Sequence, residues 1–315
     1  REQIFAHTGI QFMQFNSLYQ LLSMAVAKDP HLEGAQTFLT IPDLFNHWLC
    51  GSLVCEFTNA TTTQCLNPLT RSWAFPILEA LGIPAHIFPP VCEPGTILGN
   101  LLPAVSAETG AGSIPVIAPA CHDTGSAVVA VPARSQDFAW ISSGTWSIMG
   151  AEVQQPNLSE NALEYNFTNE GGVLGNWRLS KNIMGLWIVQ ECRRFWETQG
   201  EALSYAEINR LAAAAPPFLA SIDPDAAEFF HPGQMPEKVQ MYCVQSGQTV
   251  PHTKGEIIRV VLESLALKYC LTLQQIEELA GKQLDPIHIT GGGSQNRLLN
   301  QLTADCTGRK VVAGP

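Results

Sequence analysis

Three consecutive glycines, Gly291–Gly293, constrain this chain more than any other feature of its sequence. They follow the apolar run Ile287–Thr290, which is typical of a strand, and precede Asn296–Leu302, which has the spacing of a helix. Because glycine has no Cβ, a planar or anionic group can reach the backbone amides and the positive end of the helix dipole. The loop matches neither the Gly-x-Gly-x-x-Gly nor the Gly-Lys-Ser/Thr pattern. It indicates a nucleotide-type site, and a tight turn without a ligand is the alternative.

A second glycine turn lies in the apolar stretch Ala139–Met149, which predicts a β-hairpin with residues 142–145 at its tip. Gly144 exposes backbone amides there, and Ser143 and Thr145 add hydroxyl groups. The turn therefore has the donors for a phosphate contact. A plain hairpin turn is the alternative interpretation. Two such turns in one domain, each next to strands, strengthen the functional interpretation of both.

Asp123 is the candidate for acid–base chemistry. It stands beside His122 in a polar corner, after the run 114–118 that we expect to be a buried strand. A carboxylate at such a corner can accept the proton of a substrate hydroxyl during phosphoryl transfer. The alternative is that Asp123 only caps the segment 124–131, whose pattern fits a short helix or a strand.

Other catalytic classes have less support in the sequence. The triplet Asp123-Thr124-Gly125 is similar to an aspartic-protease loop, but such an enzyme needs a second Asp-Ser/Thr-Gly, which the sequence lacks. The sequence also lacks a Gly-x-Ser-x-Gly elbow, a His-Glu-x-x-His motif and a Cys/His cluster. We therefore assign no metal-ligating residues.

Length and charge narrow the remaining possibilities. The 315 residues suffice for two domains of about 150 each, and the formal charge of −11 would repel a nucleic-acid backbone. The apolar runs are far shorter than the ~18 residues of a membrane span. Nine scattered cysteines without a Cys-x-x-Cys pair suit reduced thiols in a cytoplasmic protein. We expect neither a nucleic-acid nor a membrane partner.

The spacing of apolar residues predicts several helices. The longer ones are expected over Ser180–Glu197, Ser204–Ala214 and Gly255–Ala280, and shorter ones near residues 16–29, 42–51 and 73–81. Short strand-like runs separated by Gly and Pro end near Pro132-Ala133-Arg134. We place the domain boundary there, which gives domains 1–132 and 133–315.

Together, these sites resemble the FGGY family of carbohydrate kinases, and in particular its members that act on L-rhamnulose. The resemblance lies in the strings Ala120–Val128, Ile141–Ser147, Thr168–Gly172, Lys181–Trp187 and Gly291–Asn296, and in the segments His7–Phe12 and Phe57–Gln64. These segments follow one another in order along essentially the whole chain.

The resemblance implies a two-domain actin-like, ribonuclease-H-like α/β fold, with a sugar-binding and a nucleotide-binding domain and a cleft between them. It implies ATP-dependent phosphorylation of the 1-hydroxyl of L-rhamnulose, assisted by Mg²⁺. Asp123 would be the general base. The sugar would be contacted by His122, Asp123, Thr124 and Asn182. ATP would be contacted by Thr145, Gln190 and Gly292.

The sequence departs from the family pattern at both ends. The family's Asp-x-Gly-Ser/Thr phosphate loop does not precede Arg1, and the rest of the nucleotide domain does not follow Pro315. We therefore expect an internal portion of a longer kinase, with little activity by itself. A kinase for another ketose, such as L-fuculose or xylulose, is one alternative. A nucleotide- or sugar-binding module without catalysis is the other.

Overall fold

The computed structural model describes residues 1–314, and in it the chain forms two units. Unit 1 comprises Arg1–Ala130 and Glu152–Ser180, and unit 2 comprises Val131–Ala151 and the described residues from Lys181 onward. The chain therefore changes unit three times. The sequence places a single boundary near residue 132, because local patterns do not show that residues 152–180 return to unit 1.

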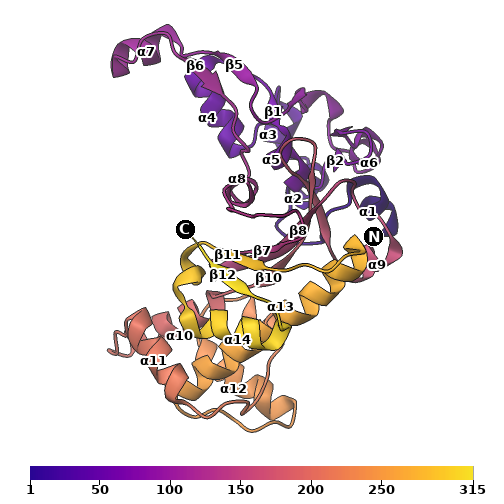
Figure 1. The fold of residues 1–315 in the computed structure, drawn as a ribbon. Coiled ribbons are helices and arrows are strands. Elements are labelled where there is room, and N and C mark those ends of the chain that lie inside the picture. Colours follow the sequence, from indigo (N-terminus) through magenta and orange to yellow (C-terminus); the bar gives the residue numbers. More distant parts are fainter. Residues whose placement is uncertain (315) are drawn as a thin grey trace. The chain divides into compact units, whose positions relative to one another are not determined.

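The elements of unit 1 are mostly short helices and two- to four-residue strands (Figure 1). In chain order they are α1 (Glu2–Thr8), α2 (Ser17–Ala27), α3 (Pro30–Glu33), α4 (Ile41–Cys50), β1 (Cys55–Glu56), α5 (Phe57–Thr62), β2 (Leu66–Asn67), β3 (Ser72–Trp73), α6 (Phe75–Ala80), the 3₁₀ turn Ala85–Ile87, β4 (Val91–Cys92), β5 (Ile97–Asn100), α7 (Pro103–Thr109), β6 (Pro115–Ile117), α8 (Asp123–Val129), α9 (Glu160–Glu164), β9 (Thr168–Gly171) and the start of β10 (Trp177–Met184). Strand β1 pairs with β4, β2 with β3, β5 with β6, and β9 with residues 177–180 of β10.

The segment 152–180 belongs to unit 1 because it completes that unit's core. The ring of Trp177 meets the ring of Phe57 edge-on, with centroids 5.4 Å apart. The backbone N–H of Asn169 donates to the carbonyl of Gly9 at 2.8 Å. The same core contains Leu18, Leu21, Leu32, Leu66, Trp73, Leu78, Ile83 and Phe88.

Unit 2 combines a sheet with long helices. In chain order its elements are β7 (Ala139–Ser143), β8 (Trp146–Val153), the end of β10, α10 (Trp187–Thr198), α11 (Tyr205–Ala214), the 3₁₀ turn Ala227–Phe229, α12 (Met235–Gln245), α13 (Lys254–Ala280), β11 (Ile287–Thr290), the 3₁₀ turn Gly292–Gln295, α14 (Arg297–Thr307) and β12 (Val311–Ala313). The strand order is β12-β11-β7-β8-β10. Strand β8 is antiparallel to β7, whereas β11 is parallel to both β7 and β12.

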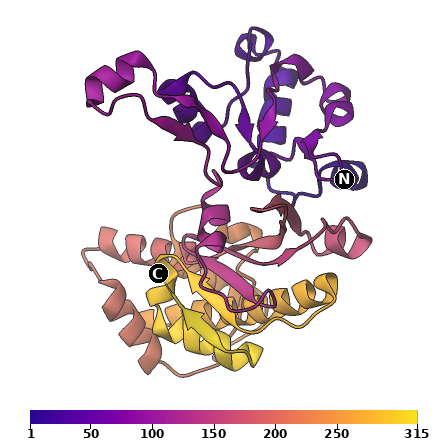
Figure 2. The same ribbon diagram turned by 45° about the horizontal axis from the view of Figure 1, so that its top comes forward.

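Helix α13 supports the sheet of unit 2. It begins at a capping box formed by Thr253 and Glu256, and it ends where Gly281 adopts a left-handed conformation. It packs against α11 and α14, and Figure 2 shows α13 and α14 alongside the sheet. Its Tyr269 hydroxyl lies 2.6 Å from the Ser147 hydroxyl of β8. This contact anchors the strand that follows the first glycine turn.

Most of the predicted elements of unit 2 are confirmed. The hairpin over 139–149 is present, with Ser143 opposite Ser147, and the strand, glycine turn and helix follow one another from β11 to α14. The helix expected over Ser180–Glu197 starts too early, because residues 180–184 continue β10 and α10 begins only at Trp187. Helical spacing in that string is overridden by strand pairing in the sheet.

In unit 1 the structure settles one open alternative and corrects one expectation. The segment after Asp123 is helical, as α8. The run 114–118 contains a strand, but Ile114 and Ile117 are about half exposed, because β6 pairs only with β5 in a two-stranded sheet. Across the described residues, no helix is both long and apolar enough to cross a bilayer.

Candidate functional site

Asp123 is the first residue of α8 and its carboxylate is open to solvent. The side chain is 96% exposed, whereas that of the preceding His122 is 17% exposed. One carboxylate oxygen, Oδ1, accepts the backbone N–H of Thr124 at 2.6 Å, and the buried Thr124 hydroxyl lies 3.4 Å from the same atom. Asp123 thus satisfies an amide in the first turn of the helix, while its side chain stays accessible to a substrate hydroxyl.

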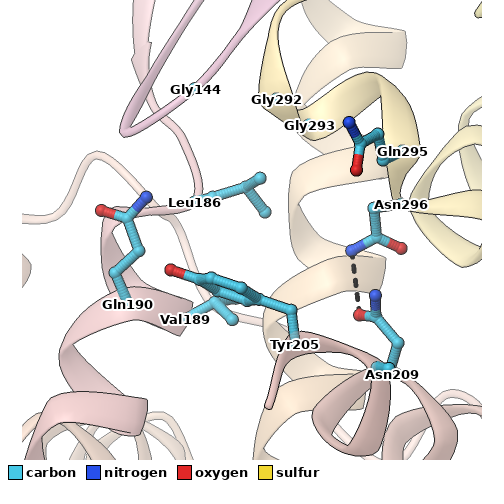
Figure 3. A pocket seen from close by; sticks show the side chains of 11 residues that line it. Gly144, Leu186, Val189, Gln190, Tyr205, Asn209, Gly292, Gly293, Gln295 and Asn296 are labelled. Atoms are coloured by element: carbon cyan, nitrogen blue, oxygen red, sulfur yellow. Dashed lines mark hydrogen bonds between the residues drawn. The ribbon is translucent and has the colours of Figure 1, made fainter.

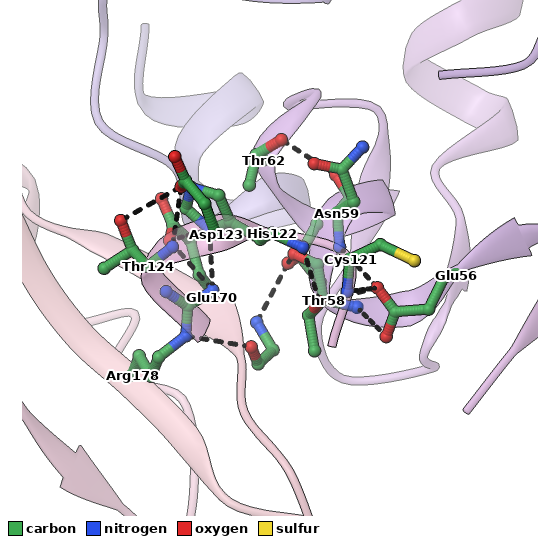
Figure 4. A network of polar contacts seen from close by, with 12 residues as sticks. Glu56, Thr58, Asn59, Thr62, Cys121, His122, Asp123, Thr124, Glu170 and Arg178 are labelled. Carbon is green, nitrogen blue, oxygen red and sulfur yellow. Dashed lines mark hydrogen bonds and ion pairs between the residues drawn. The ribbon is translucent and has the colours of Figure 1, made fainter. Parts of the chain in front are cut away.

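A buried carboxylate holds the loop that carries His122 and Asp123. Glu56 accepts the backbone N–H of Cys121 at 2.9 Å and the hydroxyl of Thr58 at 2.6 Å. The Thr58 hydroxyl in turn accepts the backbone N–H of His122 at 3.1 Å (Figure 4). Burial raises the pKa of Glu56, and the hydrogen bonds it accepts oppose that rise. The start of α5 therefore fixes the backbone immediately before the candidate base.

A buried ion pair on β9 and β10 faces the ring of His122 (Figure 4). Glu170 and Arg178 are register partners in the two strands, and their Oε2 and Nη2 atoms are 3.1 Å apart. Arg178 also donates through Nε to the carbonyl of Gly171 at 3.0 Å. Its Nη2 lies 2.9 Å from Nδ1 of His122, and that ring nitrogen lies 3.2 Å from Oε2 of Glu170.

The Nδ1 atom of His122 therefore faces a donor and an acceptor at once. A guanidinium has no lone pair to offer and does not release a proton, so a nitrogen beside it must accept. The Arg178 contact is also the shorter of the two. This contact favours an Nδ1 that accepts from Arg178, and the other ring nitrogen, Nε2, lies 3.5 Å from Oδ1 of Asp123.

The environment of Glu170 predicts a loss of stability in acid. Burial would raise the pKa of Glu170, but its electrostatic interactions with His122 and Arg178 outweigh burial and lower the pKa to about 2 from 4.5. A carboxyl group with a depressed pKa stabilises the fold above its unfolded value, and this contribution is lost as the pH falls toward the folded value. We expect the free energy of unfolding to fall between pH 4.5 and 2, and to fall less in Glu170→Gln. Urea unfolding at pH 5 and pH 3 measures this, and equal losses in both proteins would contradict it.

In unit 2 the two glycine turns pack against each other. A Cβ on Gly293 would lie 2.7 Å from the Cβ of Ser143, and one on Gly291, whose φ is +82°, would lie 2.7 Å from the Ser143 carbonyl oxygen. Real Cβ atoms do not approach so closely, so both positions require glycine. A Cβ on Gly292 would meet no atom within 4 Å. Gly292 therefore presents open backbone beside the contact between the turns.

These turns border a cavity of about 380 Å³ that lies within unit 2 (Figure 3). Its lining residues come from both turns, from α10 and α11, and from the start of α14: Gly144, Leu186, Val189, Gln190, Tyr205, Ala206, Asn209, Gly292, Gly293, Gln295 and Asn296. The Nδ2 of Asn296 donates to Oδ1 of Asn209 at 3.1 Å across the wall. The volume and the mixture of apolar and amide groups suit a small organic ligand.

The structure brings together the three residues predicted to contact ATP. Gln190 and Gly292 both line the cavity, and the Thr145 hydroxyl donates to Oε1 of Gln190 at 3.1 Å. His122, Asp123 and Thr124 form the separate cluster in unit 1. Asn182 lies on the part of β10 in unit 2 and does not line this cavity.

Several functional candidates were not identified from the sequence. In unit 1 they are Glu56, Thr58, Glu170 and Arg178, and in unit 2 they are Tyr205, Asn209 and Asn296. Thr58, Glu170 and Asn296 lie inside strings that resemble the family, which is the only signal that could have pointed to them. Arg178 lies outside those strings, and its partner residues come from distant parts of the chain.

In the part of the chain that the structure describes, no group of three or more His, Cys, Asp or Glu side chains is arranged to hold a metal ion. Mg²⁺ in nucleotide sites is often held by one or two carboxylates and by the substrate phosphates. The described side chains therefore do not supply a set of metal ligands by themselves.

Comparison with known proteins identifies the family. Residues 1–130 match the N-terminal domain, and residues 139–315 the C-terminal domain, of the FGGY family of carbohydrate kinases. Rhamnulokinase of Bacteroides thetaiotaomicron is 44% identical over 315 residues, covering 100% of this chain and 64% of that protein. Rhamnulokinase of Oceanobacillus iheyensis is 42% identical over 314 residues, covering 100% of this chain and 66% of that protein.

Solved structures agree on the fold. Xylulose kinase from Rhodospirillum rubrum superimposes with a TM-score of 0.74 at 19% identity, over 98% of this chain and 62% of that one. The fold is thus the actin-like, ribonuclease-H-like α/β fold of sugar kinases. The chain spans just under two thirds of the length of the curated relatives it matches. With both of its halves matched in order, the chain belongs to the FGGY family of carbohydrate kinases.

Proposed function

We propose that this protein takes part in the transfer of the γ-phosphoryl group of ATP to the 1-hydroxyl of L-rhamnulose, with Asp123 as the general base. The observation that carries the chemistry is the accessible Asp123 carboxylate on a backbone fixed by Glu56 and Thr58. Phosphoryl transfer depends on positioning more than on a strong base, and a carboxylate on a fixed loop supplies that positioning.

In the proposed reaction, Asp123 accepts the proton of the sugar hydroxyl as that oxygen attacks the γ-phosphorus. The bond from the γ-phosphorus to the bridging oxygen breaks, and ADP leaves with the electron pair. His122 and Thr124 are proposed to contact the sugar beside the base, and Asn182 on β10 is proposed as a further sugar contact.

The cavity of unit 2 is the proposed nucleotide site. Leu186, Val189 and Tyr205 supply apolar surface for a purine ring, and Asn209 and Asn296 supply amide groups for its edge. The open backbone of Gly292 allows a flat group to lie against it, and the Thr145–Gln190 pair adds hydrogen-bonding groups beside it. Mg²⁺ is proposed to arrive bound to the ATP phosphates, and we assign no residue to it.

The choice of sugar rests on the relatives. Two proteins named rhamnulokinase are 44% and 42% identical to the whole chain. The experiment is a coupled assay of ADP release by the protein as its gene encodes it, with L-rhamnulose, L-fuculose and xylulose. We expect the highest kcat/KM with L-rhamnulose. A higher kcat/KM with another ketose would identify that ketose as the substrate instead. ATP binding without turnover would favour a binding module.

The cysteines support a reducing, cytoplasmic location as part of the proposal. All nine are free thiols in the structure. Burial raises the pKa of Cys65 and of Cys121 to about 12, so these thiols stay protonated and unreactive.

A further inference from the structure

We propose that Arg178 is a positioning residue that fixes the tautomer of His122, so that Nε2–H of His122 lies beside the carboxylate of Asp123. Glu170 holds Arg178 in place for this task. The proposal rests on the proposed function, because it assigns Asp123 the role of base. It adds a buried pair on β9 and β10 to the residues that prepare that base.

The arrangement of Arg178 is unusual enough to require an explanation. The side chain is 1% exposed and Glu170 is 6% exposed, so both charges are removed from water. A buried ion pair contributes little net stability, because the cost of desolvating the charges offsets their attraction. A role for the pair in fixing neighbouring groups explains its presence better than stability does.

The contacts of Arg178 indicate that the group it positions is the ring of His122. Arg178 is held from two sides, by Glu170 at 3.1 Å and by the Gly171 carbonyl at 3.0 Å. Its remaining short contact is to Nδ1 of His122 at 2.9 Å. The backbone of His122 is fixed independently, through its N–H to Thr58. With the backbone of His122 and the side chain of Arg178 both held, the lone pair is on Nδ1 and the hydrogen on Nε2.

The tautomer matters because of what Nε2 faces. It lies 3.5 Å from Oδ1 of Asp123, the oxygen that also accepts the Thr124 amide. An Nε2–H group there is attracted to the carboxylate and limits its rotation. The opposite tautomer would direct a lone pair at the same oxygen and repel it. Arg178 thereby acts on Asp123 through His122, without touching the substrate.

The first test observes the tautomer directly and needs no activity. Long-range ¹H–¹⁵N correlation spectra of protein with ¹⁵N-labelled histidine distinguish a protonated ring nitrogen from an unprotonated one, and the His122 signals are those missing in His122→Gln. We expect Nε2–H in the unaltered protein. In Arg178→Met, Nδ1 loses its donor and still faces Glu170, so the hydrogen is expected to move to Nδ1.

A double variant restores the donor without a buried charge. In Arg178→Met with Glu170→Gln, the amide of residue 170 can donate to Nδ1, so we expect the hydrogen to return to Nε2. This variant also leaves no unpaired charge, so it tests the proposal even if Arg178→Met alone does not fold.

Kinetics supply the second test, on the protein as its gene encodes it. We expect Arg178→Met to lower kcat about 10- to 100-fold, because it displaces the base, and to leave KM for ATP unchanged. The double variant is expected to recover most of kcat. Arg309→Met is the matched control, since Arg309 also bridges a carboxylate, Glu277, and a carbonyl, that of Leu284, and none of the three lines the cavity.

The outcomes separate the two proposals. An Nδ1–H tautomer in the unaltered protein, or a tautomer that does not change in Arg178→Met, would overturn the positioning role. Equal losses of kcat in Arg178→Met and Arg309→Met would overturn it as well. If the unaltered protein phosphorylates no ketose, the proposed function fails, and the spectra still decide the tautomer.

Discussion

Replacing Asp123 with Asn is expected to lower kcat for ketose phosphorylation by about 100- to 10,000-fold, the contribution typical of a general base. The amide has nearly the same shape as the carboxylate and can still accept the Thr124 N–H, so α8 should begin at the same residue. What is lost is the ability to take the hydroxyl proton. The measurement is steady-state kinetics on the protein as its gene encodes it, with calorimetry for ATP.

A matched control separates the loss of the base from the loss of a helix-terminal carboxylate. Asp29 caps the short helix α3, accepts the His31 amide at 2.8 Å and contacts the His31 ring at 2.9 Å. Asp29→Asn is expected to keep full activity. ATP affinity should be the same in both variants, because the cavity lies wholly in unit 2. If Asp123→Asn turns over near the rate of the unaltered protein, Asp123 is not the general base.

Replacing Gly293 with Ala is expected to weaken ATP binding by at least about tenfold, equivalent to roughly 1.4 kcal/mol. The new Cβ would lie 2.7 Å from the Cβ of Ser143 and 3.0 Å from its carbonyl oxygen, so one turn must move away from the other. Overpacking of this kind typically costs about 1–3 kcal/mol of stability. Titration calorimetry with ATP and urea unfolding measure the two effects.

Two further substitutions test whether the close contact is the cause. Ser143→Gly removes the atoms that the new Cβ would meet most closely, so adding it to Gly293→Ala should recover part of the lost affinity. Gly292→Ala places a Cβ where no atom lies within 4 Å, so its free energy of unfolding should stay close to that of the unaltered protein. If Gly293→Ala binds ATP as tightly as the unaltered protein, the packing of the two turns does not shape the nucleotide site.

Local patterns were sufficient to predict the parts of the molecule built from neighbouring residues. The hairpin at residues 139–149, the glycine turn after β11 and the long helix α13 each depend on a short stretch with a strong signal. Consecutive glycines and the period of apolar residues both reflect the local backbone conformation, so the structure of these segments can be predicted from them.

The remainder depends on partners that lie far apart in the chain. Glu56 reaches residue 121, and Arg178 reaches His122, across 65 and 56 positions. Neither the spacing nor the type of these residues specifies such a pairing. Likewise, β10 has helix-like spacing at its end, and its place between β8 and β9 in the sheet decides its conformation.

The interleaved path of the chain affects how the protein is made. Residues emerge from a ribosome in order, yet the core of unit 1 is incomplete until Trp177 arrives to cover Phe57. Translation adds about 5–20 residues per second, so the apolar surface around Phe57 stays exposed for several seconds while the roughly 50 residues after Ala130 are made. The nascent first segment should therefore be a client for chaperones, and expression of residues 1–130 alone should yield aggregates.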